Sequence, residues 1–189
     1  GVSAGASVGA TAIIALGMFA SWGPHRLTLG ALVGALGAAG LVYLISMAQG
    51  GMTPLRLVLS GVVLSAAFSA LASFLVFRSS DPRAAQSVLY WMLGSVAGAT
   101  WDSLWVAAIV TALSAVLMIA FSGWLDALAA GTDVARSLGI PDTRVRKALF
   151  VGNSVLVGVL VAVSGGIGFV GLVIPHMSRL LVGASHRSM

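Results

Sequence analysis

Long apolar runs separated by short polar segments dominate the chain. A transmembrane helix needs about 20 consecutive, mostly apolar residues. Five runs approach this length, and each predicts a span: Gly1–Ala20, Leu27–Ala48, Pro54–Phe77, Ser103–Ser122 and Ala148–Val163. Pro54 would fall in the first turn of its helix, where its missing N–H costs no hydrogen bond. The pattern therefore predicts an all-α membrane protein, a polytopic transmembrane helix bundle.

Two further apolar stretches do not fit a simple span. Gln86–Trp101 has an internal Gly94 and a tryptophan at its end, which is typical of a re-entrant or interfacial helix. Gly165–Gly183 opens with Gly-Gly-Ile-Gly and contains Pro175, so we expect a loop followed by a short helix. Irregular backbone at membrane depth must be surrounded by protein or water.

The composition supports the membrane assignment. Hydrophobic residues make up 59% of the chain and charged residues only 8%, whereas a soluble domain carries roughly 25% charged residues. The mean hydropathy is +1.06. The absence of cysteine excludes disulfides, cysteine-ligated metals and cysteine nucleophiles.

The basic residues bear on topology rather than on nucleic acid. The chain has 10 Lys and Arg against 5 Asp and Glu, and the basic residues lie mostly in the loops, so no nucleic-acid partner is expected. With five alternating spans they divide equally between the two sides. The cluster of Arg144, Arg146 and Lys147 favours the cytoplasm for the long polar segment Gly123–Lys147.

Small residues recur at every fourth position in three of the runs. The stripes are Gly1, Gly5 and Gly9; Gly30, Gly34 and Ala38; and Gly61, Ser65, Ser69 and Ser73. Residues four apart share a helix face, and small faces let transmembrane helices approach closely. Close packing explains the glycine stripes. The serine stripe leaves three roles open: bonds to its own helix, contact with a neighbour, or the lining of a wet path.

Candidate chemistry is sparse. The middles of the last four predicted spans hold no Asp, Glu, Lys or His, whereas ion-coupled carriers usually show one there. There is no Walker A pattern and no nucleophile–base set, so the chain itself is expected to be neither an enzyme nor a metal or cofactor protein. Asn153 is predicted to hydrogen-bond between helices, and His176 to make interfacial hydrogen bonds rather than to ligate haem.

Four stretches carry a resemblance to a known family. They are Gly1–Ala10; the segment Ala-Gly-Thr-Asp-Val-Ala-Arg-Ser-Leu-Gly-Ile-Pro at 130–141; Tyr-Trp-Met-Leu-Gly-Ser at 90–95; and Ser164–Arg187, with its Gly-Gly-Ile-Gly-Phe-Val-Gly-Leu-Val-Ile-Pro-His core. They resemble the FecCD-type permeases of type II ABC importers, which take up iron-siderophores, haem and cobalamin. The resemblance extends over the whole chain. Because that family has ten spans, it implies that 1–189 is part of a single permease domain, with two helices before Gly1 and about three after Met189.

The resemblance implies the function and the partners. The chain would be the permease subunit of an ATP-driven importer in the bacterial inner (cytoplasmic) membrane. Its partners would be a pair of ATP-binding subunits, a second permease copy, identical or different, and a periplasmic or lipid-anchored substrate-binding protein. Hydrolysis would take place in the partner subunits.

The resemblance also implies roles for particular residues. Gly123–Lys147 would be a cytoplasmic coupling loop of two short helices, and its contacts with the ATPase would be Ala135, Arg136, Leu138 and Gly139. Within it, Asp133 is expected to cap a helix N-terminus. The gate would lie at Gly51, Met52, Thr53 and Pro54, and Ser65, Ser69 and Ser73 would face the pathway or the second permease.

Two other classes of function remain open on the residues alone. One is half of a secondary carrier or channel with inverted repeats, in which the glycine-rich openings at Gly1 and Gly165 would break helices near the midplane. The other is a structural membrane subunit. The lack of intramembrane charge and the long polar loop count against the carrier.

Overall fold

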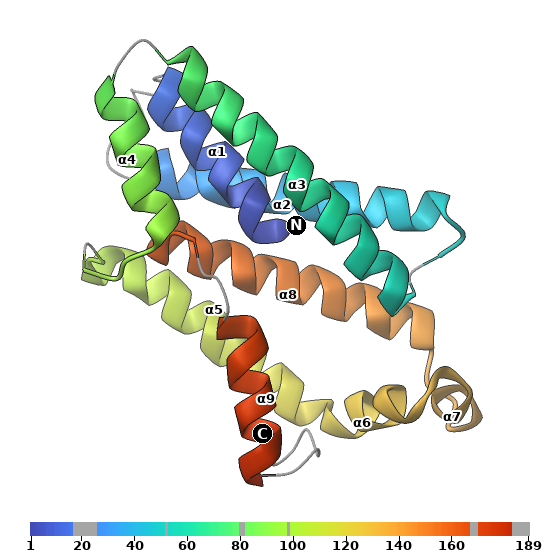
Figure 1. Cartoon of the computed structure of the whole chain (residues 1–189). Helices are drawn as coiled ribbons and strands as arrows, with labels where there is room; N and C mark the ends of the chain where they lie inside the picture. The colour runs from blue at the N-terminus through green and yellow to red at the C-terminus, as the bar shows by residue number, and fades with distance from the viewer. Residues whose placement is uncertain (17–25, 52, 80–81, 98, 167–169, 183–189) are drawn as a thin grey trace.

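The computed structural model describes residues 1–16, 26–51, 53–79, 82–97, 99–166 and 170–182. These residues form helices throughout (Figure 1). The helices are α1 (Val2–Leu16), α2 (Arg26–Ala48), α3 (Pro54–Arg78), α4 (Pro82–Leu93), α5 (Trp101–Ala120), α6 (Ser122–Ala130), α7 (Thr132–Ser137), α8 (Asp142–Ser164) and α9 (Val170–Val182). The all-α prediction is confirmed.

Among the described residues three helices are long and apolar enough to cross a membrane: α2, α3 and α8. A fourth span results if Leu104–Ala120 is counted with α6, which continues it after a bend of 65°. The expected single span Ser103–Ser122 is therefore wrong in its last residues, because the helix breaks at Phe121. The expected first span appears as the shorter apolar helix Val2–Ala15, and its predicted end at Ala20 lies outside the described residues.

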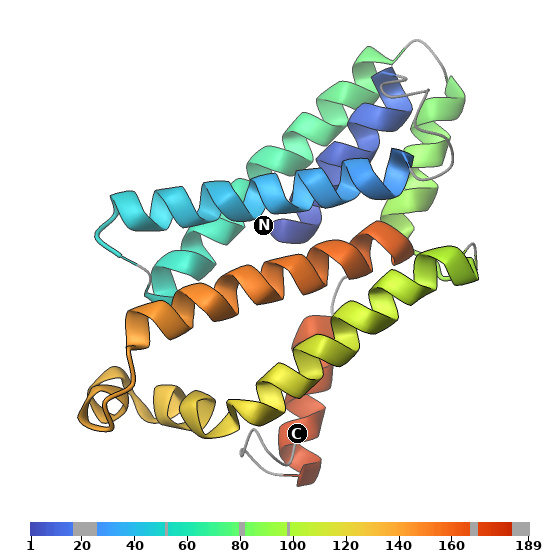
Figure 2. The ribbon, with the colours of Figure 1, turned by 180° about the vertical axis from the view of Figure 1, so that it is seen from behind.

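Different elements gather at the two ends of the bundle. The start of α8, the end of α2, the start of α3 and the short helix α7 gather at one end, which we call the α7 end (Figure 1). The end of α8, the start of α5 and α4 gather at the opposite end, which we call the α4 end (Figure 2). Polar loop residues thus lie at the two ends of apolar helices.

Helix α8 begins earlier than its apolar run. We predicted a start at Ala148, but the helix begins at Asp142, immediately after Pro141. Asp142 lies in the first turn, where a carboxylate is favoured by the helix dipole. The polar turns before Ala148 are helical because they pack against α6 and α7, and a hydropathy criterion does not detect them.

The glycine stripes of α1 and α2 form the core. A Cβ atom added at Gly9 would overlap the Gly30 carbonyl oxygen, and one added at Gly34 would overlap the Gly5 carbonyl oxygen. Around this contact Ala6, Ala10, Ala31 and Ala35 are fully buried. The prediction that these stripes serve close packing is confirmed.

The third stripe takes part in this packing only at its start, where a Cβ atom added at Gly1 would lie 3.4 Å from the Gly61 Cα. A Cβ atom added at Gly61 would meet no atom within 4 Å. Most of the α3 side chains are exposed, and only Ser60 and Ala72 are buried. Ser65 is half-buried, whereas Ser69 and Ser73 are exposed, so in the described residues this face of α3 is open only toward the end of the helix.

Gln86–Trp101 is not one interfacial helix. Its first residues form the second part of α4, which ends at Leu93, and its last residue, Trp101, is the first residue of α5. Gly94, between them, has φ 71°, a left-handed conformation that favours glycine and ends the helix. For Gly165–Gly183 we expected a loop followed by a short helix, and the short helix α9 does follow the glycine pair.

Candidate coupling site at the α7 end

The loop between α5 and α8 is packed as a small helical unit. Ala127 of α6, Ala135 of α7 and Ile140 form a buried cluster, against which Leu128 and Val145 pack. Val145 belongs to α8, so the cluster joins the loop to that helix. Two short helices were predicted here, and the cluster shows that they pack against each other and against α8.

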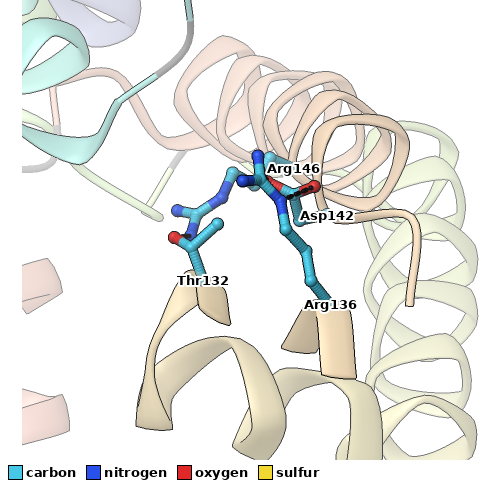
Figure 3. A network of polar contacts seen from close by, with 4 residues as sticks. All are labelled: Thr132, Arg136, Asp142 and Arg146. Atoms are coloured by element: carbon cyan, nitrogen blue, oxygen red, sulfur yellow. Dashed lines mark hydrogen bonds and ion pairs between the residues drawn. The ribbon is translucent and has the colours of Figure 1, made fainter. Parts of the chain in front are cut away.

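Two polar contacts tie α7 to the first turns of α8 (Figure 3). The Arg136 Nε donates to the Asp142 carboxylate at 3.3 Å, and its Nη2 lies 3.4 Å from the second carboxylate oxygen. The Arg146 Nη2 donates to the Thr132 hydroxyl at 3.0 Å. One contact holds the end of α7 and the other holds its beginning, so the helix is fixed at both ends.

The turn after α7 requires glycine at position 139. The Ile140 N–H donates to the Ala135 carbonyl at 3.0 Å, and the Gly139 N–H donates to the Arg136 carbonyl at 2.9 Å. This pair of bonds is the Schellman motif, in which a residue with positive φ ends the helix. Gly139 has φ 73°. The apolar contact between Ile140 and Ala135 that accompanies the motif is present.

The predicted coupling residues fall into two groups. Arg136, Leu138 and Gly139 are exposed, and Leu138 presents 66% of its surface. Ala135 has an exposed fraction of 0% and lies inside the cluster. The structure thus corrects its expected role, because Ala135 supports the loop from within and offers no contact surface.

Asp133 is not the N-cap that we expected. The residue at the N-cap of α7 is Gly131, which has no side chain to cap with, and Asp133 lies inside the first turn. There its carboxylate still favours the helix through the dipole.

The predicted gate residues form the connection between α2 and α3, at the same end as α7. The hydroxyl of Thr53 caps α3 by accepting from the Arg56 N–H at 3.4 Å, and Pro54 follows in the first turn as predicted. Gly51 has φ 119°, and its carbonyl accepts from Arg56 Nη1 at 3.4 Å. Met52 lies outside the described residues.

The serine stripe uses two of its hydroxyls on its own helix. Ser65 donates to the Gly61 carbonyl at 2.7 Å, and Ser73 donates to the Ser69 carbonyl at 3.0 Å. Of the three roles left open, back-bonding is the one seen for these two serines. Ser69 and Ser73 are exposed on α3.

Sequence reasoning missed a groove beside the coupling loop. An apolar groove of about 430 Å³ lies between α5, α6 and α8, with Trp124, Leu125 and Arg144 at the loop and Asn153 farther along α8. Asn153 is exposed and makes no hydrogen bond with the described residues, so the predicted helix–helix bond is not seen among them. On the other side of α8, the Lys147 ammonium lies 5.2 Å from the centre of the Tyr43 ring. Only the tertiary placement of α2 and α8 could have revealed this pair.

Apolar helices of membrane-spanning length, joined at one end by a packed helical loop, define a multi-pass membrane protein. The model of the FecCD transport family matches residues 1–189. The chain belongs to this family.

Curated relatives agree with this membership. The chain is 36% identical over 191 residues to the cobalamin import system permease protein BtuC of Halobacterium salinarum, an alignment that covers 99% of the chain and 49% of the relative. It is 34% identical to the molybdate import system permease protein MolB of Haemophilus influenzae, over 100% of the chain and 55% of that protein. It is 33% identical to the Fe(3+)-citrate import system permease protein YfmD of Bacillus subtilis, over 99% of the chain and 54% of that protein. The chain thus spans about half the length of these relatives.

A solved structure shows the same fold. It is described as an inward-facing conformation of a metal-chelate type ABC transporter, and it superposes with a TM-score of 0.88 at 34% identity. The superposition covers 100% of this chain and 58% of the other. The resemblance stated from the sequence motifs is confirmed.

Proposed function

We propose that the chain is the permease portion of an ATP-driven importer, in which it contributes to the translocation path and couples to a separate ATPase. The observation that carries the proposal is the coupling loop: a helical unit fixed to α8 by the Arg136–Asp142 and Arg146–Thr132 contacts. A loop built only to connect α5 and α8 would not need a buried cluster and two polar ties. Family membership supplies the context for this loop.

The coupling surface would be the exposed side of α7 and its turn. Leu138 offers an apolar contact, and Arg136 offers a guanidinium whose side chain is 62% exposed although it is paired with Asp142. Arginine is enriched at protein interfaces, and the fully buried core of an interface is more apolar than the rest of the surface. Ala135 and Gly139 would act by holding this surface in shape.

The orientation follows from the same loop. Docking on a cytoplasmic ATPase puts the α7 end in the cytoplasm, and the cluster of Arg144, Arg146 and Lys147 at that end agrees with the positive-inside rule. The bacterial inner (cytoplasmic) membrane is the proposed location. The α4 end would then face the substrate-binding protein.

The path would run along α3. The turn with Gly51, Thr53 and Pro54 would form the gate at the cytoplasmic end, and the face with Ser65, Ser69 and Ser73 would line the path or meet the second permease copy. The support is the exposure of Ser69 and Ser73 in a helix of membrane-spanning length.

The mechanism is alternating access driven by nucleotide. Binding and hydrolysis of ATP would move the coupling helices, and the gate would open and close with them. Nucleotide can shift the population of two states only if those states fit the ATPase differently. The fixed shape of α7 is what would make such a difference in fit possible.

The cargo class is taken from the relatives. Their names include cobalamin, Fe(3+)-citrate and molybdate. We propose a metal chelate or cobalamin, as the motifs implied; the molybdate relative widens the range beyond the iron and cobalt compounds first expected.

The test is cysteine accessibility at the coupling loop. The 189 residues contain no cysteine, so Ser137→Cys in the full-length permease, with cysteines elsewhere replaced, gives a single label site on α7. A membrane-impermeant maleimide should label it in inverted vesicles only, and the ATPase subunit should protect it. Ser87→Cys on α4 is the matched control and should be labelled only from outside, without protection by the ATPase. Labelling of Ser137→Cys from outside, or indifference to the ATPase, would reject the coupling role and favour the carrier alternative.

A further inference from the structure

The ends of α4 and α8 are joined through main-chain atoms. The Ser95 N–H donates to the Ser164 carbonyl at 2.7 Å, and the Gly166 N–H donates to the Trp91 carbonyl at 3.3 Å. Two segments far apart in the sequence are thus linked by two hydrogen bonds, which we call the α4–α8 junction.

Glycine is required on both sides of this junction. Gly94 and Gly165 have φ 71° and φ 78°, in the left-handed region where other residues are strained. A Cβ atom added at Gly94 would overlap the Gly166 carbonyl oxygen, and one added at Gly165 would overlap the Trp91 carbonyl oxygen. At Gly166 the added Cβ would lie 2.6 Å from the Met92 carbonyl oxygen. The contact therefore leaves no room for side chains between the two backbones, and a close-packed contact of this kind has little slack.

The opposite end of α8 is also joined to a neighbour, in this case through side chains. Asp142 and Arg146, in its first two turns, bind Arg136 and Thr132 of the coupling loop. Between these contacts and the junction α8 is one unbroken helix of 23 residues, which corresponds to a length of about 35 Å. The helix therefore connects the coupling loop at the α7 end with α4 at the other end (Figure 1).

We propose that the α4–α8 junction passes the movement of the coupling helices to α4, so that Gly94, Gly165 and Gly166 are positioning residues of the transport cycle. The inference rests on the proposed function. In it α8 and α4 move together as one body, and the two transport states differ in where this body stands against α3. Because α4 follows α3 closely in the chain, its displacement would alter the end of α3 that lies opposite the gate.

The test uses the full-length permease with its ATPase and binding protein in proteoliposomes. Gly166→Ala introduces the overlap with the Met92 carbonyl without left-handed strain, and Gly94→Ala introduces overlap and strain together. Both variants should still co-purify with the ATPase, because the junction is remote from the coupling loop. Uptake, and the stimulation of ATP hydrolysis by the loaded binding protein, should fall by about tenfold, a typical size for a coupling between sites. Gly37→Ala, on α2 with nothing within 4 Å of the added Cβ, is the matched control and should leave both readouts unchanged.

A second variant tests the junction without weakening it. Ser95→Cys combined with Ser164→Cys places two thiols on segments that a backbone hydrogen bond joins, and formation of the disulfide on oxidation is verified before uptake is measured. If α8 and α4 move as one body, oxidation leaves uptake unchanged, and reduction provides the internal comparison. Loss of uptake on oxidation would overturn the proposal, since the junction would then have to open.

The remaining outcomes separate the two hypotheses. Wild-type uptake in both glycine variants would overturn the proposed junction and leave the importer function standing. A wild-type complex that shows no ATP-dependent uptake would contradict the proposed function and remove this inference with it.

Discussion

Arg136 and Asp142 face each other across the turn at Gly139, with the guanidinium Nε 3.3 Å from a carboxylate oxygen. The pair joins the last turn of α7 to the first turn of α8. Its two side chains differ in exposure, 62% for Arg136 against 14% for Asp142. The ion pair therefore lies at a surface, where such pairs contribute little to stability.

Asp142→Asn should lower the free energy of unfolding by about 0.5 kcal/mol, because solvent screens a pair that is this exposed. Thermal unfolding of the full-length permease in detergent measures the effect, which should vanish at high salt. Asp133→Asn is the matched control: it too removes a carboxylate from a first helical turn, but one that pairs with no described residue. A loss of several kcal/mol in Asp142→Asn alone would show that the pair holds the loop by itself.

Thr132→Val should destabilise α7, although the two side chains have nearly the same size. The substitution keeps the shape of the side chain but leaves the half-buried Arg146 without its acceptor, a cost of about 1 kcal/mol. Hydrogen exchange should become faster in the amides of α7 and stay unchanged in α2. Thr143→Val, exposed on α8, is the control, and equal exchange in the two variants would contradict the role of this bond.

Gly34→Ala should destabilise the permease by about 1–3 kcal/mol, because the new methyl group would overlap the Gly5 carbonyl and force α1 and α2 apart. Gly37→Ala lies one turn farther along the same helix and meets no atom within 4 Å. It should be neutral or slightly stabilising, since alanine favours helix over glycine. Thermal unfolding of both variants compares the two, and equal midpoints would refute the close approach of the helices.

Thr53→Ala removes the N-cap of α3. The bond from the Arg56 N–H is long, 3.4 Å, so the loss should lie near the lower end of the range for caps, about 0.5 kcal/mol. Thr53→Ser keeps the hydroxyl and should restore stability. If the turn is also the gate, Thr53→Ala should raise ATP hydrolysis that is not matched by uptake, whereas unchanged coupling would argue against a gate at this position.

Ser69→Cys distinguishes a path from a dimer contact. A water-filled path should give fast reaction with a hydrophilic thiol reagent in the assembled transporter. Leu113→Cys on α5, exposed in this chain to 58%, should react slowly because it would face lipid. Rapid disulfide formation between two copies, without reaction of Ser69→Cys with the reagent, would assign this face to the permease dimer instead.

The apolar runs predicted the long helices well. The expected Leu27–Ala48 differs from α2 by one residue, because burial in lipid requires a helix of this length whatever its neighbours are. The break at Phe121 lies within two residues of the expected end at Ser122, next to Gly123, but the 65° bend into α6 was not predicted. The early start of α8 at Asp142 was missed for the complementary reason: its polar turns are helical through packing and not through hydropathy.

The position of the candidate site in the chain could be predicted from the sequence, but the orientation and contacts of its residues could not. The motif at 130–141 located the coupling loop, but only the fold shows that Ala135 faces inward and that Arg146 reaches Thr132. Gly94 and Gly165 were marked as irregular backbone. Their contact joins segments far apart in the chain, and local patterns carry no information on such pairs.

The serines of α3 bear on how such a transporter chooses its cargo. The Ser65 and Ser73 hydroxyls already donate hydrogen bonds to carbonyls of their own helix. Along the proposed path these two positions would present a passing molecule with oxygen lone pairs and methylene groups, and with no donor in search of a partner. Among the described residues Ser69 alone of the three serines has a hydroxyl without such a bond, so this wall has few means of telling one solute from another. Selectivity would then be decided before the cargo enters the membrane, which is consistent with relatives named for solutes as unlike as molybdate and cobalamin.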